Sequence, residues 1–199
     1  MGRHPLTHEE IEAERARVVQ AAEALFAAHG YEGVTLRALA QALGRSHTAA
    51  YRYFEGKAEI FAATRIAAYR RFAEAQEQAL RATDDHRERL SRLGESYIRF
   101  GLESPDAYRL MFELKRLADS DATREAEDRA WQPLRDAVSD AIDAGDLQGD
   151  PDVVAHLLWA GLHGLLSLHL AGKLRHGVSF EDLAQPMRTM LRVGNLGTP

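Results

Sequence analysis

The sequence predicts an all-α protein with about nine helices. Apolar residues recur at helical spacing along most of the chain, and no segment shows the strict alternation of a half-buried strand. Hydrophobic residues make up 45% of the 199 residues and charged residues 28%, an ordinary balance for a folded protein. The chain contains no cysteine, which excludes a disulfide framework, a cysteine zinc site and a thiol nucleophile and fits a cytoplasmic location.

The first third of the chain is expected to form three helices and the start of a long fourth one. Apolar side chains of the first helix share one face, and Gly30 ends it. Thr35 is a good N-cap for a second helix, which Gly44 ends, and Ser46 caps a third. A long fourth helix, residues 57–82, follows.

Five more helices are expected in the rest of the chain. Ser104-Pro105 ends the fifth helix, because the residue before a proline is biased away from helical geometry. Gly145 ends the seventh, and Asp150-Pro151 starts the eighth, since proline is favourable at the first helical position. The predicted ranges are 86–103, 106–118, 121–144, 151–172 and 180–193.

The second and third helices match the pattern of a helix-turn-helix. Their sequences are TLRALAQALG (35–44) and SHTAAYRYF (46–54). Ala40 is small where the two helices would cross, and Gly44 can adopt the positive φ of a tight turn. The apolar residues expected inside are Leu36, Leu39, Leu43, Ala50 and Phe54.

Polar and basic side chains fill the outward face of this segment. Residues 35–57 carry a net charge of +3 in a chain whose total is −5, and a local basic patch is what DNA contact needs. Arg45, His47 and Thr48 lie where recognition helices meet base edges, whereas Tyr51 and Lys57 suit phosphates. The candidate DNA contacts are Thr35, Arg37, Arg45, Ser46, His47, Thr48, Tyr51, Arg52, Tyr53 and Lys57.

Residues 15–61 resemble the DNA-binding domain of TetR-type transcriptional regulators. Many members of that family read Gly-x-Ser, then Leu-Tyr-x-His-Phe, then a lysine three residues on. Here Ala50 replaces the leucine, Tyr53 replaces the histidine, and Gly56 stands where a Ser or Asn cap is common. The residues that carry the resemblance are Ala24, Leu25, Phe26, Gly30, Tyr31, Thr35, Leu36, Ala40, Gly44, Ser46, Tyr51, Phe54, Lys57 and Phe61.

This resemblance implies an all-helical homodimer that binds a double-stranded DNA operator and a small-molecule effector, without a cofactor or a membrane. Residues 1–57 would form the DNA-binding domain, and residues 58–199 the ligand-binding domain, which dimerises through the last two helices. The implied function is that of a ligand-responsive regulator, interpreted as a repressor released from a palindromic operator. Trp159 and His163-Gly164 also resemble the Trp…His-Gly feature of one subgroup.

Six aromatic residues and one histidine of the C-terminal domain are candidate ligand contacts. Each aromatic residue lines either a pocket or the plain core, because pockets between helices are themselves mostly apolar. The histidine is either a buried residue with satisfied hydrogen bonds or a polar anchor for a ligand. The candidates are Tyr97, Phe100, Tyr108, Phe112, Trp131, Trp159 and His163, and they suggest a mostly apolar ligand.

Residues 153–172 carry no Asp, Glu, Lys or Arg and are long enough to span a bilayer. Their three histidines, serine and three glycines, and the polar remainder of the chain, favour a helix buried in a core or an interface. Gly161 and Gly164 would allow close approach of another helix, such as that of a dimer partner. His156 and His163 share a face, but no Asp or Glu completes a metal site, so no metal is expected.

Two other function classes stay open. A helical enzyme could use His163 or the acidic residues of the seventh helix, but the sequence shows no nucleophile–base pair, phosphate loop or paired carboxylates in apolar surroundings, so we expect no catalytic residues. In a protein-interaction module, the helix-turn-helix would be purely structural. Substitution of Tyr51 and Lys57 distinguishes this case, because an interaction module has no DNA affinity to lose.

Overall fold

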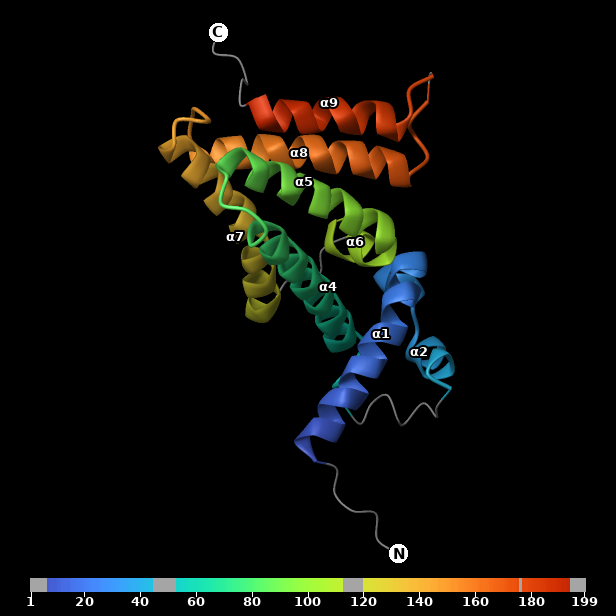
Figure 1. The fold of residues 1–199 in the computed structure, drawn as a ribbon. Coiled ribbons are helices and arrows are strands. Elements are labelled where there is room, and N and C mark those ends of the chain that lie inside the picture. The colour runs from blue at the N-terminus through green and yellow to red at the C-terminus, as the bar shows by residue number, and fades with distance from the viewer. Residues whose placement is uncertain (1–6, 45–52, 113–119, 176, 194–199) are drawn as a thin grey trace, which may run out of the picture. The chain divides into compact units, whose positions relative to one another are not determined.

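The computed structural model describes residues 7–44, 53–112, 120–175 and 177–193, with side chains described as far as residue 186. Every regular element within these ranges is a helix, which confirms the predicted all-α class. The predicted third helix falls largely on residues 45–52, outside the described residues. Figure 1 shows the eight described helices: α1 (His8–Gly33), α2 (Leu36–Ala42), α4 (Lys57–Leu80), α5 (His86–Glu103), α6 (Pro105–Phe112), α7 (Asp121–Asp143), α8 (Pro151–Leu170) and α9 (Phe180–Val193).

Local capping explains where most helices begin. The Thr35 hydroxyl accepts a hydrogen bond from the backbone N–H of Ala38, and the Asp85 carboxylate accepts one from the N–H of Glu88. The Asp150 carboxylate caps α8, which has a proline at its start. Gly30 adopts a φ of 67° and interrupts α1, as expected from the sequence, although helical turns resume up to residue 33.

The chain folds as two compact units. The first unit contains Met1–Tyr69 and Asp106–Ala126, and the second contains Arg70–Pro105 and Glu127–Pro199. The first unit is therefore discontinuous in sequence, because α6 and the start of α7 join the N-terminal helices. Helix α4 contributes its first half to the first unit and its second half to the second.

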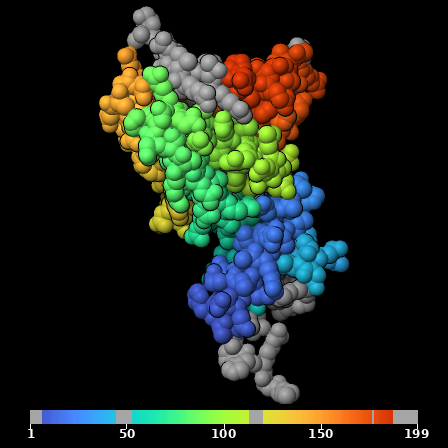
Figure 2. Space-filling model, in the orientation of Figure 1, coloured from blue at the N-terminus to red at the C-terminus, as the bar shows by residue number. Residues whose placement is uncertain are grey.

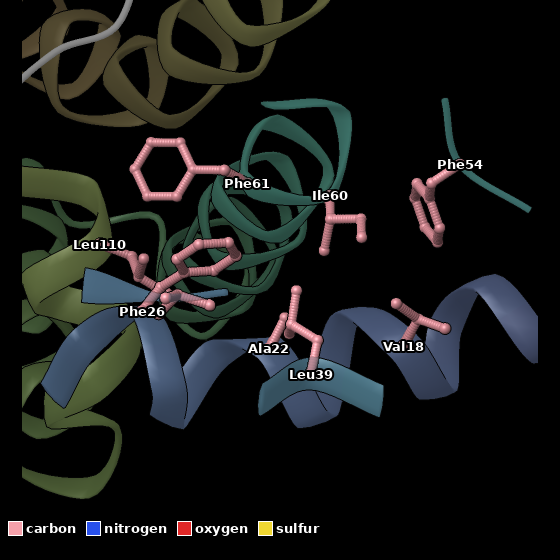
Figure 3. Close-up of a cluster of buried hydrophobic side chains, with 9 residues drawn as sticks. Val18, Ala22, Phe26, Leu39, Phe54, Ile60, Phe61 and Leu110 are labelled. Atoms are coloured by element: carbon pink, nitrogen blue, oxygen red, sulfur yellow. The ribbon is translucent and has the colours of Figure 1, made fainter. Parts of the chain in front are cut away.

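The core of the first unit gathers side chains from four helices and the segment before α4. Figure 3 shows Phe26 of α1, Leu39 of α2, Phe61 of α4 and Leu110 of α6 pointing into one cluster. The rings of Phe26 and Phe61 meet edge to face, with centroids 4.9 Å apart. Phe54 is 3% exposed, which confirms that it turns inward. Side chains of α1 (blue) and α2 (light blue) also lie in direct contact in Figure 2.

Helix α6 is anchored to α4 inside the first unit. The Arg65 guanidinium donates through Nε to the carbonyl of Leu110 at 3.2 Å, and the Tyr69 hydroxyl donates to the carbonyl of Met111 at 2.9 Å. The last carbonyls of a helix have no partner within that helix, so these two buried side chains cap the C-terminal end of α6. The first unit thus holds α6 by its backbone as well as by its apolar side chains.

The core of the second unit lies between α5, α7 and α8. Leu90 and Leu93 of α5 pack with Val138 of α7 and Val154 of α8. Helix α9 packs against both α5 and α8, and the three helices run side by side in Figure 1. This arrangement buries one side of α8 and leaves its other side open in the single chain.

By length and composition, helix α8 (20 residues) is long and apolar enough to cross a membrane. Only 28% of its most apolar stretch is buried. The buried part packs in the core of the second unit, so the expected burial of this helix is met only in part within the single chain. The rest of the helix is only partly covered, and its exposed apolar side chains bear on how the protein assembles.

Candidate functional site

The first turn of α2 carries two of the predicted DNA contacts. Thr35 and Arg37 are both exposed, while Val34 and Leu39 on either side of them are buried in the core. The Thr35 hydroxyl oxygen accepts from the Ala38 N–H at 3.1 Å, and a hydroxyl can donate and accept at once. The buried neighbours therefore fix the direction in which the Arg37 guanidinium leaves the helix.

Arg15 of α1 anchors the residues that lead into α4. Its guanidinium donates to the backbone carbonyl of Tyr53 and pairs with the Glu59 carboxylate at 2.8 Å. It also lies over the ring of Phe54, 4.1 Å from the ring centroid, in cation–π geometry. Arg15 thus links α1, residues 53–54 and α4. Residues 53–54 directly follow the segment 45–52, where most predicted DNA contacts lie. Sequence reasoning missed this role because the ion pair joins residues 44 positions apart.

Lys57 begins α4, as predicted, and is half-buried. Its ammonium donates to the backbone carbonyl of Tyr31 at 2.9 Å and lies 4.1 Å from the centroid of the Tyr31 ring. A lysine ammonium has three donors, so this contact leaves capacity for a further acceptor such as a phosphate oxygen. Tyr53 is also half-buried, and its side chain packs against the core of the first unit.

The Glu59 carboxylate links the same segments through its second oxygen. Burial raises the pKa of Glu59, but hydrogen bonds from the Glu55 backbone N–H and from Arg15, with the positive charge of Arg15, outweigh burial and lower the pKa below its usual value. The Glu55 N–H donates to Oε2 at 2.6 Å, and Arg15 donates to Oε1. The charged form of Glu59 therefore stabilises this part of the fold.

We predict that acid weakens the first unit partly through Glu59. Because the folded-state pKa is lowered, the unfolded chain binds more protons in this range, and the stabilisation present above about pH 4.3 is lost as pH falls through the folded pKa. Glu59→Gln should flatten the pH dependence of the free energy of unfolding, measured by urea unfolding between about pH 3 and 6. Glu12→Gln, at an exposed position of α1, is the control and should keep the wild-type profile. A wild-type profile in Glu59→Gln would contradict this role.

The aromatic candidates for ligand contact are divided between the two units. In the first unit, Phe112 meets the rings of Tyr108 and Tyr69 at centroid distances of 5.1 and 6.3 Å. In the second unit, Phe72 of α4 packs edge to face on Tyr97 and Phe100, at 5.6 and 5.2 Å. The structure therefore places Tyr108 and Phe112 in the first unit and the other candidates in the second.

Two tryptophans and two histidines form a ring cluster between α7 and α8. The Trp131 ring lies 4.5 Å from His156 and 6.0 Å from Trp159, and Trp159 lies 5.5 Å from His163. His163 Nδ1 is 3.1 Å from the Tyr97 hydroxyl, which belongs to α5. His163 thus has a hydrogen-bond partner in the folded chain, and it joins Tyr97 to the tryptophan cluster.

Two protein-family models match this chain, one in its N-terminal part and one in its C-terminal part. Residues 18–64 match the model described as bacterial regulatory proteins of the TetR family. Residues 90–193, more than half of the chain, match the tetracyclin repressor-like C-terminal domain. The chain belongs to the TetR family. It is a DNA-binding transcriptional regulator with an N-terminal helix-turn-helix and a C-terminal helical domain.

Individual proteins are similar to this TetR-family chain in sequence or in fold. The HTH-type transcriptional activator FasR from Mycolicibacterium smegmatis is 28% identical over 128 residues, 64% of this chain and 58% of FasR. A protein of unknown function from Rhodococcus sp. RHA1 matches with a TM-score of 0.80 at 24% identity, over 96% of this chain and 98% of that one. FadR from Bacillus subtilis, solved in complex with stearoyl-CoA, matches with a TM-score of 0.75 at 14% identity, over 90% of this chain and 98% of FadR.

Several predicted contacts of this TetR-family regulator lie outside the described residues. They are Arg45, Ser46, His47, Thr48, Tyr51 and Arg52. Their roles stay predictions. Among the residues that the structure does describe, no group of three or more His, Cys, Asp or Glu side chains could hold a metal ion.

Proposed function

We propose that this TetR-family chain is a repressor that leaves a palindromic operator when a small, mostly apolar ligand binds. The observation that carries the proposal is the presence of both family models in one chain, a DNA-binding domain followed by an effector-type domain. We place the functional boundary near residue 57. Two DNA-binding domains in a dimer would read half-sites about 34–36 Å apart.

The DNA-facing surface is proposed from α2 and the predicted third helix. Thr35 and Arg37 would bind the DNA phosphate backbone on one side of the major groove, and Lys57 would bind it on the other side. Residues Arg45, His47 and Thr48 would reach base edges. The anchorage of Tyr53 and Phe54 by Arg15 supports this proposal, because it fixes the point at which that helix must end.

We propose that two copies of the chain associate through α8 and α9. Val153 and Leu157 of α8 are 57% and 55% exposed, and Leu168 on the same side is 48% exposed. A Cβ built on Gly164 would meet no atom within 4 Å in the described residues, so this chain leaves room there for another helix. A dimer that covers this surface would complete the burial of α8, which favours association with a second copy over a membrane. We accordingly propose a cytoplasmic protein.

The ligand is proposed to bind in the second unit, which contains five of the seven candidate contacts. Tyr97 and Phe100 are buried and pack on Phe72, and His163 is a polar group beside the Tyr97 hydroxyl. The FadR structure with stearoyl-CoA shows that a protein of this fold holds a long acyl chain, which supports an apolar ligand here. Tyr108 and Phe112 would then serve mainly as core residues of the first unit.

Activation of transcription is the second candidate. The relative FasR is named as an activator, and this chain shares 28% identity with it over 128 residues. Repression and activation use the same DNA-binding surface and differ in where the operator lies relative to the promoter. A reporter gene placed behind the operator distinguishes them by the direction of its response.

The proposal is tested by mixing the purified protein with random DNA duplexes and sequencing those it retains. We expect an enriched palindrome, because a symmetric dimer presents two identical DNA-binding surfaces. Retention without enrichment, lost steeply with added salt, would show phosphate binding alone and contradict the specific regulator. A ligand carried through purification would also block retention, so the experiment includes protein refolded from denaturant.

A further inference from the structure

Gln76 of α4 carries a buried polar atom that the fold does not satisfy. The residue is 4% exposed, and its Oε1 atom has no hydrogen-bond partner among the residues that the structure describes. Nearly all buried polar side-chain atoms in proteins are hydrogen-bonded, so an exception calls for an explanation. A buried acceptor left without a donor destabilises the free protein and favours any molecule that supplies one.

The position of Gln76 in the second unit follows from three contacts between α4 and α5. The Ser96 hydroxyl donates to the carbonyl of Ala75 at 3.2 Å, and Phe72 packs on Tyr97 and Phe100. Gln76 lies one helical turn after Phe72 and therefore on the same face of α4. Gln76 thus lies on the side of α4 that packs against α5.

Polar groups of α5 and α8 in the same unit are hydrogen-bonded within the chain. The Tyr97 hydroxyl is 3.1 Å from His163 Nδ1, and His163 Nε2 is 3.4 Å from the Ser167 hydroxyl. Tyr97 is 5% exposed. The side chains of Tyr97, His163 and Ser167 thus have partners within the chain, whereas the Gln76 Oε1 acceptor has none among the described residues.

We propose that Gln76 is a specificity-determining residue that accepts a hydrogen bond from the head group of the effector. The ligand class is an amphipathic small molecule with an apolar body and an O–H or N–H donor at one end. The apolar body would lie against the aromatic side chains of α4 and α5. This inference rests on the proposed function, since it names the chemistry of the ligand that the second unit binds.

The test compares two probes, 1-decanol and decyl methyl ether, in which a methyl group replaces the hydroxyl hydrogen and so removes the donor. Both tryptophans of the chain lie in the second unit, so their fluorescence reports binding to the full-length protein. We expect the wild-type protein to bind the alcohol about tenfold more tightly than the ether, because the ether leaves the buried acceptor unpaired. Gln76→Leu should bind both probes with equal affinity, close to that of the wild-type protein for the ether.

Melting temperatures of the ligand-free proteins separate this role from a structural one. Gln76→Leu removes an unsatisfied acceptor and should melt at the same temperature as the wild type or higher. The matched control is Gln78→Leu, the same change at an exposed position of α4, which should keep the preference for the alcohol. A lower melting temperature for Gln76→Leu would show that Oε1 is satisfied in the free protein and would overturn the proposal.

Two further results would also overturn it: a preference for the alcohol that persists in Gln76→Leu, or no binding of either probe. Release of operator DNA is measured separately on the same samples. Binding with the expected preference but without release of DNA would support the Gln76 site and contradict the proposed effector response. The two proposals therefore fail in distinguishable ways.

Discussion

Leu157→Glu is expected to convert the proposed α8–α9 dimer into monomers and to lower operator affinity by at least about 100-fold. Leu157 lies in the middle of α8 and is 55% exposed in the single chain, on the side that includes Val153 and Leu168. In a two-fold interface each residue acts twice, so the change removes two apolar contacts and introduces two buried carboxylates. Size-exclusion chromatography with light scattering measures the mass, and fluorescence anisotropy measures DNA affinity.

The control for this experiment is Leu102→Glu. Leu102 is 41% exposed near the end of α5, so it offers the same chemical change on another helix. We expect this variant to stay dimeric and to bind DNA as the wild type does. A dimeric Leu157→Glu protein with unchanged DNA affinity would show that the partner helix does not cover this side of α8.

Arg37→Glu is expected to lower operator affinity by about 100-fold at moderate salt and to reduce the slope of log affinity against log salt by about two. The proposed dimer would present Arg37 twice, so two of the proposed phosphate contacts would be lost together. Folding should not suffer, because Arg37 is exposed in the first turn of α2, where a negative charge interacts favourably with the helix dipole. Anisotropy titrations at several salt concentrations measure both quantities.

Arg99→Gln is the control for Arg37, since it removes an exposed basic side chain from α5 in the second unit. Its salt slope should match that of the wild type. An unchanged slope in Arg37→Glu would remove α2 from the proposed DNA-facing surface. A loss of affinity with a lowered melting temperature would instead point to a folding defect.

The sequence predicted helix ends well because they depend on neighbouring residues. Thr35 caps α2 through the backbone N–H of Ala38, three positions away, and Asp150 caps α8 through the N–H groups of Asp152 and Val153. Such signals act within one turn and can be read from a single chain. The inward orientation of Phe54 followed from helical spacing in the same way and is confirmed by its burial.

Contacts between distant segments could not be predicted by this reasoning. The sequence gives no local sign that Arg15 would reach Tyr53 and Glu59, or that the ammonium of Lys57 would meet the carbonyl of Tyr31. Spacing also could not assign aromatic residues to one unit or the other, because core and pocket positions share the same apolar periodicity. The predicted third helix and its DNA contacts stay predictions, because residues 45–52 lie outside the described residues.

The anchorage of α6 in the first unit has a consequence for synthesis on the ribosome. Leu110 belongs to the same core as Phe26 and Phe61, yet residues 70–105 must be made before it appears. The nascent N-terminal helices therefore emerge without a core side chain and without the backbone partners of Arg65 and Tyr69. We expect the first unit to acquire protease resistance on stalled ribosomes only after α6 has left the exit tunnel, when part of the second unit has already been made.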